Sequence, residues 1–485
     1  MSGEKIRIGI IGGGASGSMA CKACLEEGFE PMVFEKNSYT GGLWRYHDEN
    51  IDGVASVAKS TIINSSKEMT AFSDFPPPKD FPNYMHNTKM VKYFDLYGES
   101  FRYEKYVKLR HDVIGLEPNG DYDSTGRWKL TARDHTNADK ITEYVFDGVM
   151  ICTGHHVQPQ VTTFKDQHLY TGQIAHTHSY KRPDQYTDKK VVVVGIGNSG
   201  GDVAVELSSV SDKVYLSTRR GTWISNRVGP YGLPSDISFI RRHTNVLFKY
   251  LPYNILCTIL ESVANRRIDH EKYQLKPKHR ILSQNVFVND ALPNCILSGT
   301  VVVKGDINRF TAHGVIFAGE SKEIPCDVVL MATGYKLKFP FISQDLIRTT
   351  NNKVELFKYV FPPDLKHPKT LAFISLVQPL GATLPIGEMQ CRWFAQLMAG
   401  KRSLPTRQNM LADIAVKQHA MKRYYESERH TIQVDWLNFM DELAQHVGVK
   451  PNLLKYFFQD RELWRALMFG PALPYQYRLE GIILD

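Results

Sequence analysis

The chain has 485 residues, of which 42% are hydrophobic and 23% charged. It is long enough for about three domains and too apolar for a disordered chain. The net charge of +8 comes from 59 basic and 51 acidic residues, and the basic residues are scattered in pairs without forming a long stripe. We therefore expect no nucleic-acid partner, and instead an anionic cofactor or a membrane surface.

The first predicted element is a strand, IRIGII, that leads into a glycine-rich turn. This turn places Gly12, Gly14 and Gly17 at the spacing G-x-G-x-x-G. In dinucleotide-binding folds the first glycine permits a tight turn, the second lets a pyrophosphate approach the backbone, and the third lets helix and strand pack closely. A helix is predicted through Ala20 to Glu27, and its positive N-terminal end would face the pyrophosphate.

A second strand, PMVFEK, ends at Glu35, about 20 residues past the glycines, where an acidic side chain binds the hydroxyls of a ribose. We therefore predict that this unit binds a dinucleotide with a free 2′-hydroxyl. The helix between the two strands contains Cys21 and Cys24. Small buried side chains are the commoner explanation of such a pair, and a redox role is the alternative. Seven irregularly spaced cysteines argue against a disulfide framework.

The glycine pattern recurs in KKVVVVGIGNSGGD, where Gly195, Gly197 and Gly200 keep the spacing. The strand that follows, KVYLSTRRG, ends in Arg219 and Arg220 where the first copy has its acid. Arginine attracts the 2′-phosphate that distinguishes NADP from NAD. We assign the second unit to NADP(H), with exposed arginines on a turn as the alternative.

Two further segments repeat, FDGVMICTG at 146–154 and CDVVLMATG at 326–334. Each has an aspartate, an apolar strand and Thr-Gly, at nearly the same distance from its own glycine-rich turn. This duplication predicts an α/β fold with two Rossmann-like dinucleotide-binding domains. In the simplest topology the second domain is inserted into the first, which the chain after Thr333 completes. VQPLGATLP at 377–385 is predicted as an irregular loop that approaches a planar ligand, or as a plain loop end.

The predicted boundaries follow from these repeats. We expect the first part of the first dinucleotide-binding domain at 1–160, a linker at 161–185, the NADPH-binding domain at 186–334 with an insertion at about 223–299, and the second part of the first domain with the C-terminal region at 335–485.

The segment at 246–260, VLFKYLPYNILCTIL, is the most apolar part of this insertion. It is shorter than a spanning helix and contains Lys249 and Pro252, so we do not expect it to cross a bilayer. Basic pairs flank it, as in a segment that lies in the membrane interface. A helix pair in the core or at a subunit contact is the alternative. No apolar anchor is expected before Asp485.

In this order the motifs resemble those of flavin-containing monooxygenases, most closely the animal enzymes that oxygenate nitrogen and sulfur in small molecules. The resemblance extends from about Ile6 to about Arg478. Its motifs are the two fingerprints, GGLW at 41–44, INSSKEM at 63–69, TGHH at 153–156 and ATGY at 332–335. The family signature F-x-G-x-x-x-H-x-x-x-F/Y is matched in YTGQIAHTHSY by Gly172, His176 and Tyr180, with Tyr170 in place of phenylalanine.

The resemblance implies cofactor-binding roles for residues of both units. Those that would bind FAD are Gly12, Gly13, Gly14, Ala15, Ser16, Gly17, Glu35, Gly42, Leu43, Trp44, Asn64, Ser65 and Gln378. Those that would bind NADPH are Gly195, Gly197, Ser199, Gly200, Gly201, Asp202 and Arg219, with Ile63 and Asn64 near the nicotinamide. A turn with a buried tryptophan is the alternative for GGLW, and a helix cap is the alternative for INSSKEM.

The resemblance also implies the chemistry. NADPH reduces FAD, O2 forms a C4a-hydroperoxyflavin, and an amine or a sulfide takes its distal oxygen. Asn64 is the predicted catalytic residue, because a neutral amide donates a hydrogen bond without supplying a proton. We expect no metal, since the pairs His155-His156 and His176-His178 lack further ligands at a suitable spacing.

Three alternative functions remain compatible with these residues. The first is Baeyer-Villiger oxidation of ketones. Relatives that perform this reaction usually end the signature with tryptophan, so Tyr180 favours nitrogen or sulfur oxygenation. The second alternative is a disulfide reductase that uses Cys21 and Cys24, and the third is a non-catalytic flavoprotein that serves as a binding partner. By resemblance we expect the cytoplasmic face of the endoplasmic reticulum membrane, with the cytosol as the alternative, and a possible homodimer.

Overall fold

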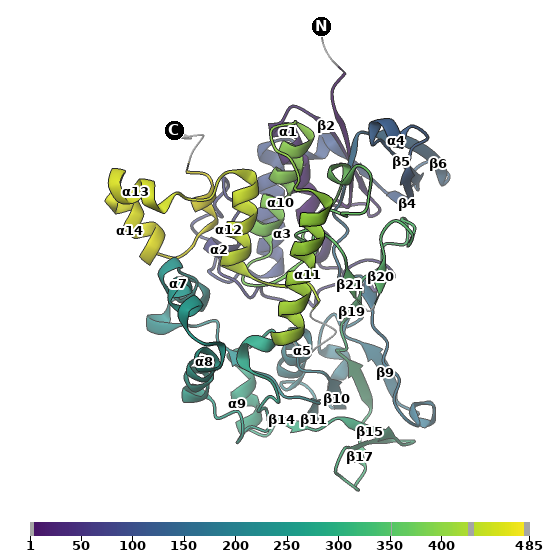
Figure 1. Ribbon diagram of the computed structural model, residues 1–485. Coiled ribbons are helices and arrows are strands. Elements are labelled where there is room, and N and C mark those ends of the chain that lie inside the picture. The colour runs from purple at the N-terminus through teal and green to yellow at the C-terminus, as the bar shows by residue number, and fades with distance from the viewer. Residues whose placement is uncertain (1–3, 351, 425–430, 480–485) are drawn as a thin grey trace.

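The structure, a computed structural model, describes residues 4–350, 352–424 and 431–479 (Figure 1). The predicted range 335–485 therefore includes positions outside the described residues, Asp485 among them. Two parallel five-stranded sheets form the frame, with orders β22-β7-β1-β2-β3 and β14-β11-β10-β18-β9. The first contains β1 (Arg7–Ile11), β2 (Glu30–Glu35), β3 (Val107–Leu109), β7 (Gly148–Ile151) and β22 (Leu371–Phe373). The second contains β9 (Gln173–His176), β10 (Lys190–Val194), β11 (Lys213–Ser217), β14 (Val301–Lys304) and β18 (Val328–Met331).

The two sheets have equivalent strands in equivalent places. β1 and β10 each lead into a glycine-rich turn and pair with the strand that follows the next helix, β2 or β11. On their other side they pair with β7 and β18, the strands of the second repeat. Each unit also has an antiparallel three-stranded sheet. In the first unit, β4 (His111–Pro118), β5 (Trp128–Asp134) and β6 (Lys140–Phe146) precede β7. In the second unit, β15 (Ile307–Phe310), β16 (Gly314–Phe317) and β17 (Ile324–Pro325) precede β18. The predicted duplication is confirmed.

The insertion of the second unit into the first is confirmed by the last strand of the first sheet. β22 follows the whole second unit in the chain, yet it pairs with β7, and Leu371 lies opposite Val149. The chain therefore leaves the first sheet after β7 and returns to it at β22. The domain boundaries themselves stay predictions, and part of the predicted linker, Gln173–His176, is β9 at the edge of the second sheet.

Helices cover both sheets and fill the space around them (Figure 1). The helix after each glycine-rich turn is α1 (Ala15–Glu26) or α5 (Asn198–Leu207), and α10 (Leu384–Met398) packs along α1. The others include α2 (Lys67–Thr70), α3 (Asn87–Ser100), α4 (Tyr122–Thr125), α11 (Arg407–Tyr424), α12 (Trp436–Val447), α13 (Leu453–Gln459) and α14 (Arg461–Phe469).

Cys21 and Cys24 belong to the buried face of α1. Both side chains are completely buried in the core of the first unit and neither is in a disulfide. Burial raises the pKa of both thiols far above the ordinary value, so neither supplies a thiolate. The interpretation as small buried side chains is confirmed, and a disulfide reductase mechanism through this pair is contradicted.

The insertion at about 223–299 contains α6 (Ser235–Phe239), α7 (Arg242–Tyr250), α8 (Tyr253–Arg267) and α9 (Leu292–Leu297). In the chain the first three lie between the short strands β12 (Ile224–Ser225) and β13 (Phe287–Val288), and α9 lies between β13 and the second sheet's β14. The segment 246–260 is a helix pair, interrupted at Pro252, and only part of it is buried. Leu256 and Cys257 are buried, whereas other apolar side chains of the pair are exposed. Leu247 is 59%, Tyr250 80% and Ile255 51% exposed. In the described part of the chain, no helix is long and apolar enough to cross a membrane.

The signature segment connects the two units. β9 pairs with β18, and the Nε2–H of His176 donates to the carbonyl oxygen of Gly334 at 3.1 Å, in the turn after β18. The hydroxyl of Tyr180 donates to Glu206 on α5 at 3.0 Å. The ammonium of Lys181 then donates to the hydroxyl of Ser56 in the first unit at 2.6 Å. The segment therefore holds the second unit directly and reaches the first through the residue after the signature.

Tyr170, the departure from the family signature, has a partner for its additional hydroxyl. That hydroxyl donates to the carbonyl oxygen of Cys326 at 2.9 Å, and the ring packs edge-on against Phe310. A Cβ at Gly172 would overlap the Tyr170 ring and lie 2.7 Å from the carbonyl oxygen of Asp327. The glycine at this position therefore allows the backbone to approach both groups closely.

We predict that Tyr170→Phe lowers the free energy of unfolding by about 1 kcal/mol, because the buried carbonyl of Cys326 loses its donor. Urea unfolding at neutral pH measures the difference. Tyr215→Phe is the matched control, since the hydroxyl of Tyr215 on β11 has no hydrogen-bond partner among the described residues. Equal stability of Tyr170→Phe and the unchanged protein would contradict this account of the hydroxyl.

Candidate active site

A cavity of about 3170 Å³ reaches from the glycine-rich turn of the first unit to that of the second. Residues of both units and of the insertion line it. The predicted site residues that line it are Gly12, Gly14, Ala15, Ser16, Glu35, Gly42, Leu43, Trp44, Ile63, Asn64, Ser65, Gly195, Gly197, Ser199, Gly200, Asp202, Arg219 and Gln378. Two sets of residues assigned to two nucleotides thus share one cavity.

Three predicted glycines, Gly13, Gly17 and Gly201, are not among the lining residues. The amide of Gly13 donates to the carboxylate of Glu35 at 2.7 Å. A Cβ at Gly17 would overlap the carbonyl oxygen of Gly12, and a Cβ at Gly201 would overlap the ring of Phe287. These glycines permit close packing behind the turns, and their contacts with a cofactor stay predictions.

The first turn forms a cradle that only glycine backbone can make. Gly12 has φ +108°, and a Cβ there would lie 2.6 Å from the carbonyl oxygen of Cys152. The GGLW segment lies against this turn, since the amide of Gly41 donates to Gly13 at 3.2 Å and a Cβ on Gly42 would lie 3.1 Å from the Cα of Gly14. A pyrophosphate can therefore approach the backbone and the N-terminus of α1, as FAD requires.

Glu35 ends β2 as predicted, and it is only 6% exposed. One carboxylate oxygen accepts from Gly13, and the other accepts from both nitrogens of Asn37 at 2.8 Å. Burial raises the pKa of this carboxyl above its ordinary value, against the effect of these hydrogen bonds. The oxygen that accepts only from Gly13 retains a lone pair, so it can also accept from a ribose hydroxyl.

The second turn repeats the contacts of the first. Gly195 has φ +108°, and a Cβ there would lie 2.6 Å from the carbonyl oxygen of Ala332. A Cβ at Gly197 would have no described atom within 4 Å, so this backbone is open to a ligand. Arg219 follows β11, is largely exposed, and has its Nε 4.0 Å from the nearest carboxylate oxygen, on Asp306. This donor set fits a dinucleotide with a 2′-phosphate.

The predicted catalytic residue, Asn64, is in the lining of the cavity that joins the two turns. Its Oδ1 accepts from the Nη2 of Arg227 at 2.6 Å. Ser66 caps α2, because its Oγ accepts from the amide of Met69 at 3.3 Å. The helix-cap alternative for INSSKEM is therefore correct for Ser66, and it leaves the side chain of Asn64 available to a cofactor.

The expected loop at 377–385 requires a correction, whereas Gln378 itself lines the cavity and its assignment to a cofactor stays a prediction. An irregular loop is the sequence-based expectation for 377–385, but β23 (Gln378–Leu380) pairs with β24 (Gln433–Asp435), starting with a 2.8 Å hydrogen bond from the amide of Gln378 to Ile432. Pro and Gly predict a loop locally, whereas the partner strand lies more than fifty positions further along. Only Gly381, at φ +145° against the indole of Trp436, has the expected special backbone.

Several residues near the site carried no sequence signal. Arg227, Tyr84 and Asp236 contact the Asn64 region or each other across more than 140 positions of sequence. Ser375, at φ +59° after β22, accepts a hydrogen bond from the hydroxyl of Ser16 at 2.9 Å. None of them belongs to a short motif, because each contact joins segments that lie far apart in the chain.

The histidines after β7 lie in the wall of the cavity as neutral rings. Burial lowers the pKa of His156 to about 4, and that of His155 lies well below its ordinary value. In the described ranges, no three His, Cys, Asp or Glu residues are grouped to hold a metal ion. Neither ring is therefore a ready proton donor at neutral pH.

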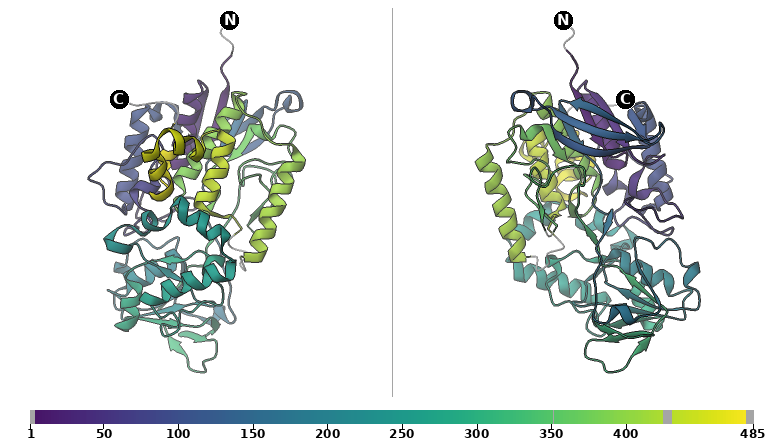
Figure 2. Two further views of the ribbon diagram at one scale, coloured as in Figure 1. Left: turned by 60° about the vertical axis from the view of Figure 1, so that its left-hand side comes forward. Right: turned by 90° about the vertical axis from the view of Figure 1, so that its right-hand side faces the viewer.

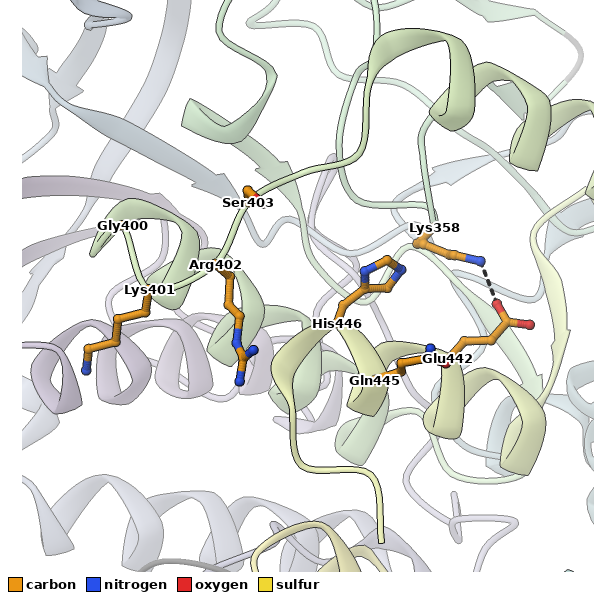
Figure 3. A pocket seen from close by; sticks show the side chains of 8 residues that line it. All are labelled: Lys358, Gly400, Lys401, Arg402, Ser403, Glu442, Gln445 and His446. Atoms are coloured by element: carbon orange, nitrogen blue, oxygen red, sulfur yellow. Dashed lines mark hydrogen bonds and ion pairs between the residues drawn. The ribbon is translucent and has the colours of Figure 1, made fainter. Parts of the chain in front are cut away.

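A smaller hollow, of about 670 Å³, lies on the C-terminal part of the first unit (Figure 3). Its buried lysine, Lys358, pairs with Glu442 at 2.8 Å and with Asp413 at 2.6 Å. The lining residues are Lys358, Gly400, Lys401, Arg402, Ser403, Glu442, Gln445 and His446. None of the predicted cofactor residues is among them, so the candidate active site is the large cavity.

We predict that Arg219→Ala weakens NADP⁺ binding by about 10- to 100-fold, because a charge-assisted contact to the 2′-phosphate is lost. NAD⁺, which lacks this phosphate, should bind as before. Isothermal titration calorimetry of the FAD-loaded protein measures both affinities, with Arg309→Ala on β15 as a control for the loss of one exposed charge. An equal loss of affinity for both nucleotides would contradict the assignment of Arg219.

Comparisons with known proteins place the chain in a family. The model of flavin-binding monooxygenase-like proteins matches residues 5–482. The chain is 46% identical to flavin-containing monooxygenase 5 of Homo sapiens and 39% identical to dimethylaniline monooxygenase (N-oxide-forming) 2 of Oryctolagus cuniculus. Each match covers 98% of this chain and 89% of the relative.

Solved structures share the fold at lower identity. S-allyl-L-cysteine S-oxygenase from Allium sativum has a TM-score of 0.70 at 20% identity, over 99% of this chain and 96% of that one. Cyclohexanone monooxygenase from Rhodococcus sp. Phi1 has a TM-score of 0.64 at 13% identity, over 92% of this chain and 98% of that one. The chain belongs to the flavin-binding monooxygenase-like family, whose members depend on FAD and NADPH.

Proposed function

We propose that the protein transfers one oxygen atom of O2 to a soft nitrogen or sulfur atom of a small molecule. NADPH and a proton are consumed, and the other oxygen atom leaves as water. The observation that carries this proposal is the single cavity that joins both glycine-rich turns, with Asn64 in its lining. A relative named for the N-oxide that it forms from dimethylaniline supports nitrogen as one of the oxygenated atoms.

The first turn, with Glu35 and GGLW, would hold FAD, and the second turn, with Arg219, would hold NADPH. When bound, these cofactors supply the hydride and the activation of O2. The protein then has three tasks in the shared cavity: to orient both cofactors, to exclude water, and to place a hydrogen-bond donor where charge develops.

Asn64 fits the last task. Its carboxamide oxygen is occupied by Arg227, so its NH2 group is the part that remains for a ligand. A carboxamide donates without giving up a proton. The neutral rings of His155 and His156 in the same cavity also withhold protons, since burial lowers the pKa of both. Such surroundings favour transfer of oxygen to the substrate over its release as H2O2.

The substrate panel that tests the proposal contains a tertiary amine, an aryl methyl sulfide and a cyclic ketone. We predict one N-oxide or sulfoxide formed per NADPH consumed, as measured by oxygen uptake and mass spectrometry. Ester from the ketone, without N-oxide or sulfoxide, would overturn the proposal in favour of Baeyer-Villiger chemistry. A bound flavin that NADPH does not reduce would instead indicate a non-catalytic binding partner.

Replacement of Asn64 tests the residue itself. We predict that Asn64→Ala retains FAD but forms about 10² to 10³ times less oxygenated product per unit time, because one preorganised donor is lost. NADPH should still be consumed, with H2O2 as the product. Asn119→Ala, a change in the distant β4–β5 connection, is the control. A wild-type yield of product per NADPH from Asn64→Ala would contradict the assignment.

We also propose that 246–260 contacts a membrane surface, at the cytoplasmic face of the endoplasmic reticulum rather than in the cytosol. Val246, Leu247 and Tyr250 on α7 and Ile255 and Ile259 on α8 are exposed apolar side chains. Helix α14 lies beside α7, and α13 packs against α14 (Figure 1 and Figure 2). Both helices carry further exposed apolar side chains. Lys249 and Arg266 supply positive charge on these helices, as interfacial helices commonly do.

The double variant Leu247→Glu/Ile255→Glu should lose most of its binding to vesicles that contain anionic lipid, because acidic groups replace apolar ones at the interface. Co-sedimentation measures this, with Val416→Glu on α11 as an equally exposed control. Unchanged binding would contradict the membrane proposal. A second copy is the competing occupant, and a dimer that this variant dissociates in light scattering without lipid would favour it.

A further inference from the structure

One loop of the insertion, residues 226–236, contacts the segment that contains Asn64. The Nη2 of Arg227 donates to the Oδ1 of Asn64 at 2.6 Å. Two positions along, the backbone amide of Ser66 donates to the Oδ2 of Asp236, also at 2.6 Å. The insertion therefore holds both ends of the three-residue segment 64–66.

The loop itself is closed by its own hydrogen bonds. The amide of Gly229 donates to the carbonyl oxygen of Leu233 at 2.7 Å, and the hydroxyl of Ser235 donates to Asn226 at 2.5 Å. Outside the loop, the amide of Arg227 donates to Asp290 at 3.0 Å. Arg227 and Asp236 are thus presented by one small, internally bonded unit.

Tyr84 of the first unit completes the contact. Its hydroxyl donates to the carbonyl oxygen of Arg227 at 2.7 Å and accepts from the amide of Ser235 at 3.3 Å. The next residue, Met85, accepts a hydrogen bond from the amide of Ile63 at 3.0 Å. The loop and the residue before Asn64 are therefore hydrogen-bonded to two adjacent residues of the first unit, Tyr84 and Met85.

The chemistry of arginine fixes the orientation of the Asn64 carboxamide. A guanidinium has donors and no acceptor, so only the oxygen of Asn64 can face Arg227. The NH2 group must then point away from Arg227, and Asn64 lines the cofactor cavity. Asp236 is a half-buried carboxylate whose bond to a backbone amide is charge-assisted, so it restrains the backbone next to Asn64.

We infer that Arg227 and Asp236 are positioning residues for Asn64: they set its donor group toward the cofactor cavity and couple docking of the insertion to assembly of the oxygenation site. This inference rests on the proposed function for the role of Asn64, and on the contacts above for the positioning itself.

Hydrogen exchange tests the positioning without reference to activity. In the FAD-loaded protein, Asp236→Ala should speed exchange of the Ser66 amide about ten-fold or more, because its charged acceptor is lost. Arg280→Ala is the matched control, since Arg280 pairs with Glu261 at 2.8 Å inside the insertion. If Asp236→Ala does not fold, Asp236→Asn replaces it, with a smaller acceleration expected. Unchanged exchange at Ser66 would overturn the inference.

A double-mutant cycle tests whether Arg227 acts through Asn64. Arg227→Ala should lower product formed per NADPH about ten-fold, and Arg227→Lys, which retains a charged donor, should restore part of it. In the Asn64→Ala background, the further change Arg227→Ala should have less than about a two-fold effect. An equal loss in both backgrounds would show that Arg227 acts independently of Asn64 and would overturn the inference.

The two experiments separate the two claims. If the unchanged protein consumes NADPH without oxygenating any amine or sulfide, the proposed function fails. Exchange at Ser66 in Asp236→Ala then still decides whether the loop positions the segment.

Discussion

The structure depends on two backbone contacts that leave no room for a side chain. Gly12 packs against the carbonyl of Cys152, and Gly195 packs against that of Ala332, both at φ +108°. A Cβ on either glycine would lie 2.6 Å from the carbonyl oxygen that it faces. In both units the contact joins the end of the first strand to the strand of the second repeat. A nucleotide can reach the amide groups at the start of α1 and α5 only because these turns are so tight. The duplication of the sequence is therefore also a duplication of this constraint.

The insertion of one unit in the other brings the two turns to one cavity. The signature segment, which includes β9, lies in the chain between β7 of the first sheet and β10 of the second, and polar side chains in it and next to it connect the units. His176 binds the turn after β18, Tyr180 binds α5, and Lys181 reaches the first unit. A family signature of glycine, histidine and an aromatic residue thus has a structural explanation, in which no member of the signature needs to take part in chemistry.

Much of this arrangement was predictable from local patterns. The strands that flank the two turns, the turns themselves and Glu35 at the end of β2 follow from hydrophobic runs and glycine spacing, which depend on neighbouring residues. The return of the chain to the first domain after Thr333 follows from the duplication, although the strand that makes it, β22, was not predicted. Gln378 shows the limit, because its strand exists only through a partner from β24. Gly13 and Gly201 show a second limit of prediction, because the glycine motif does not distinguish a glycine that contacts a ligand from one that packs against the protein. Arg227 and Asp236 could not be predicted, because their partners lie over 160 positions away and no spacing rule connects them.

The central claim is that two cofactors share one cavity, with the donor group of Asn64 directed into it. A crystal structure of the protein with FAD and NADP⁺ tests this most directly. We predict the pyrophosphate of FAD at the turn of Gly12 and that of NADP⁺ at the turn of Gly195, with both redox rings in the common cavity. The NH2 group of Asn64 should lie within hydrogen-bond distance of one ring system, and its oxygen on Arg227. Either ring outside the cavity, or Asn64 with its NH2 group turned away from both, would contradict the account.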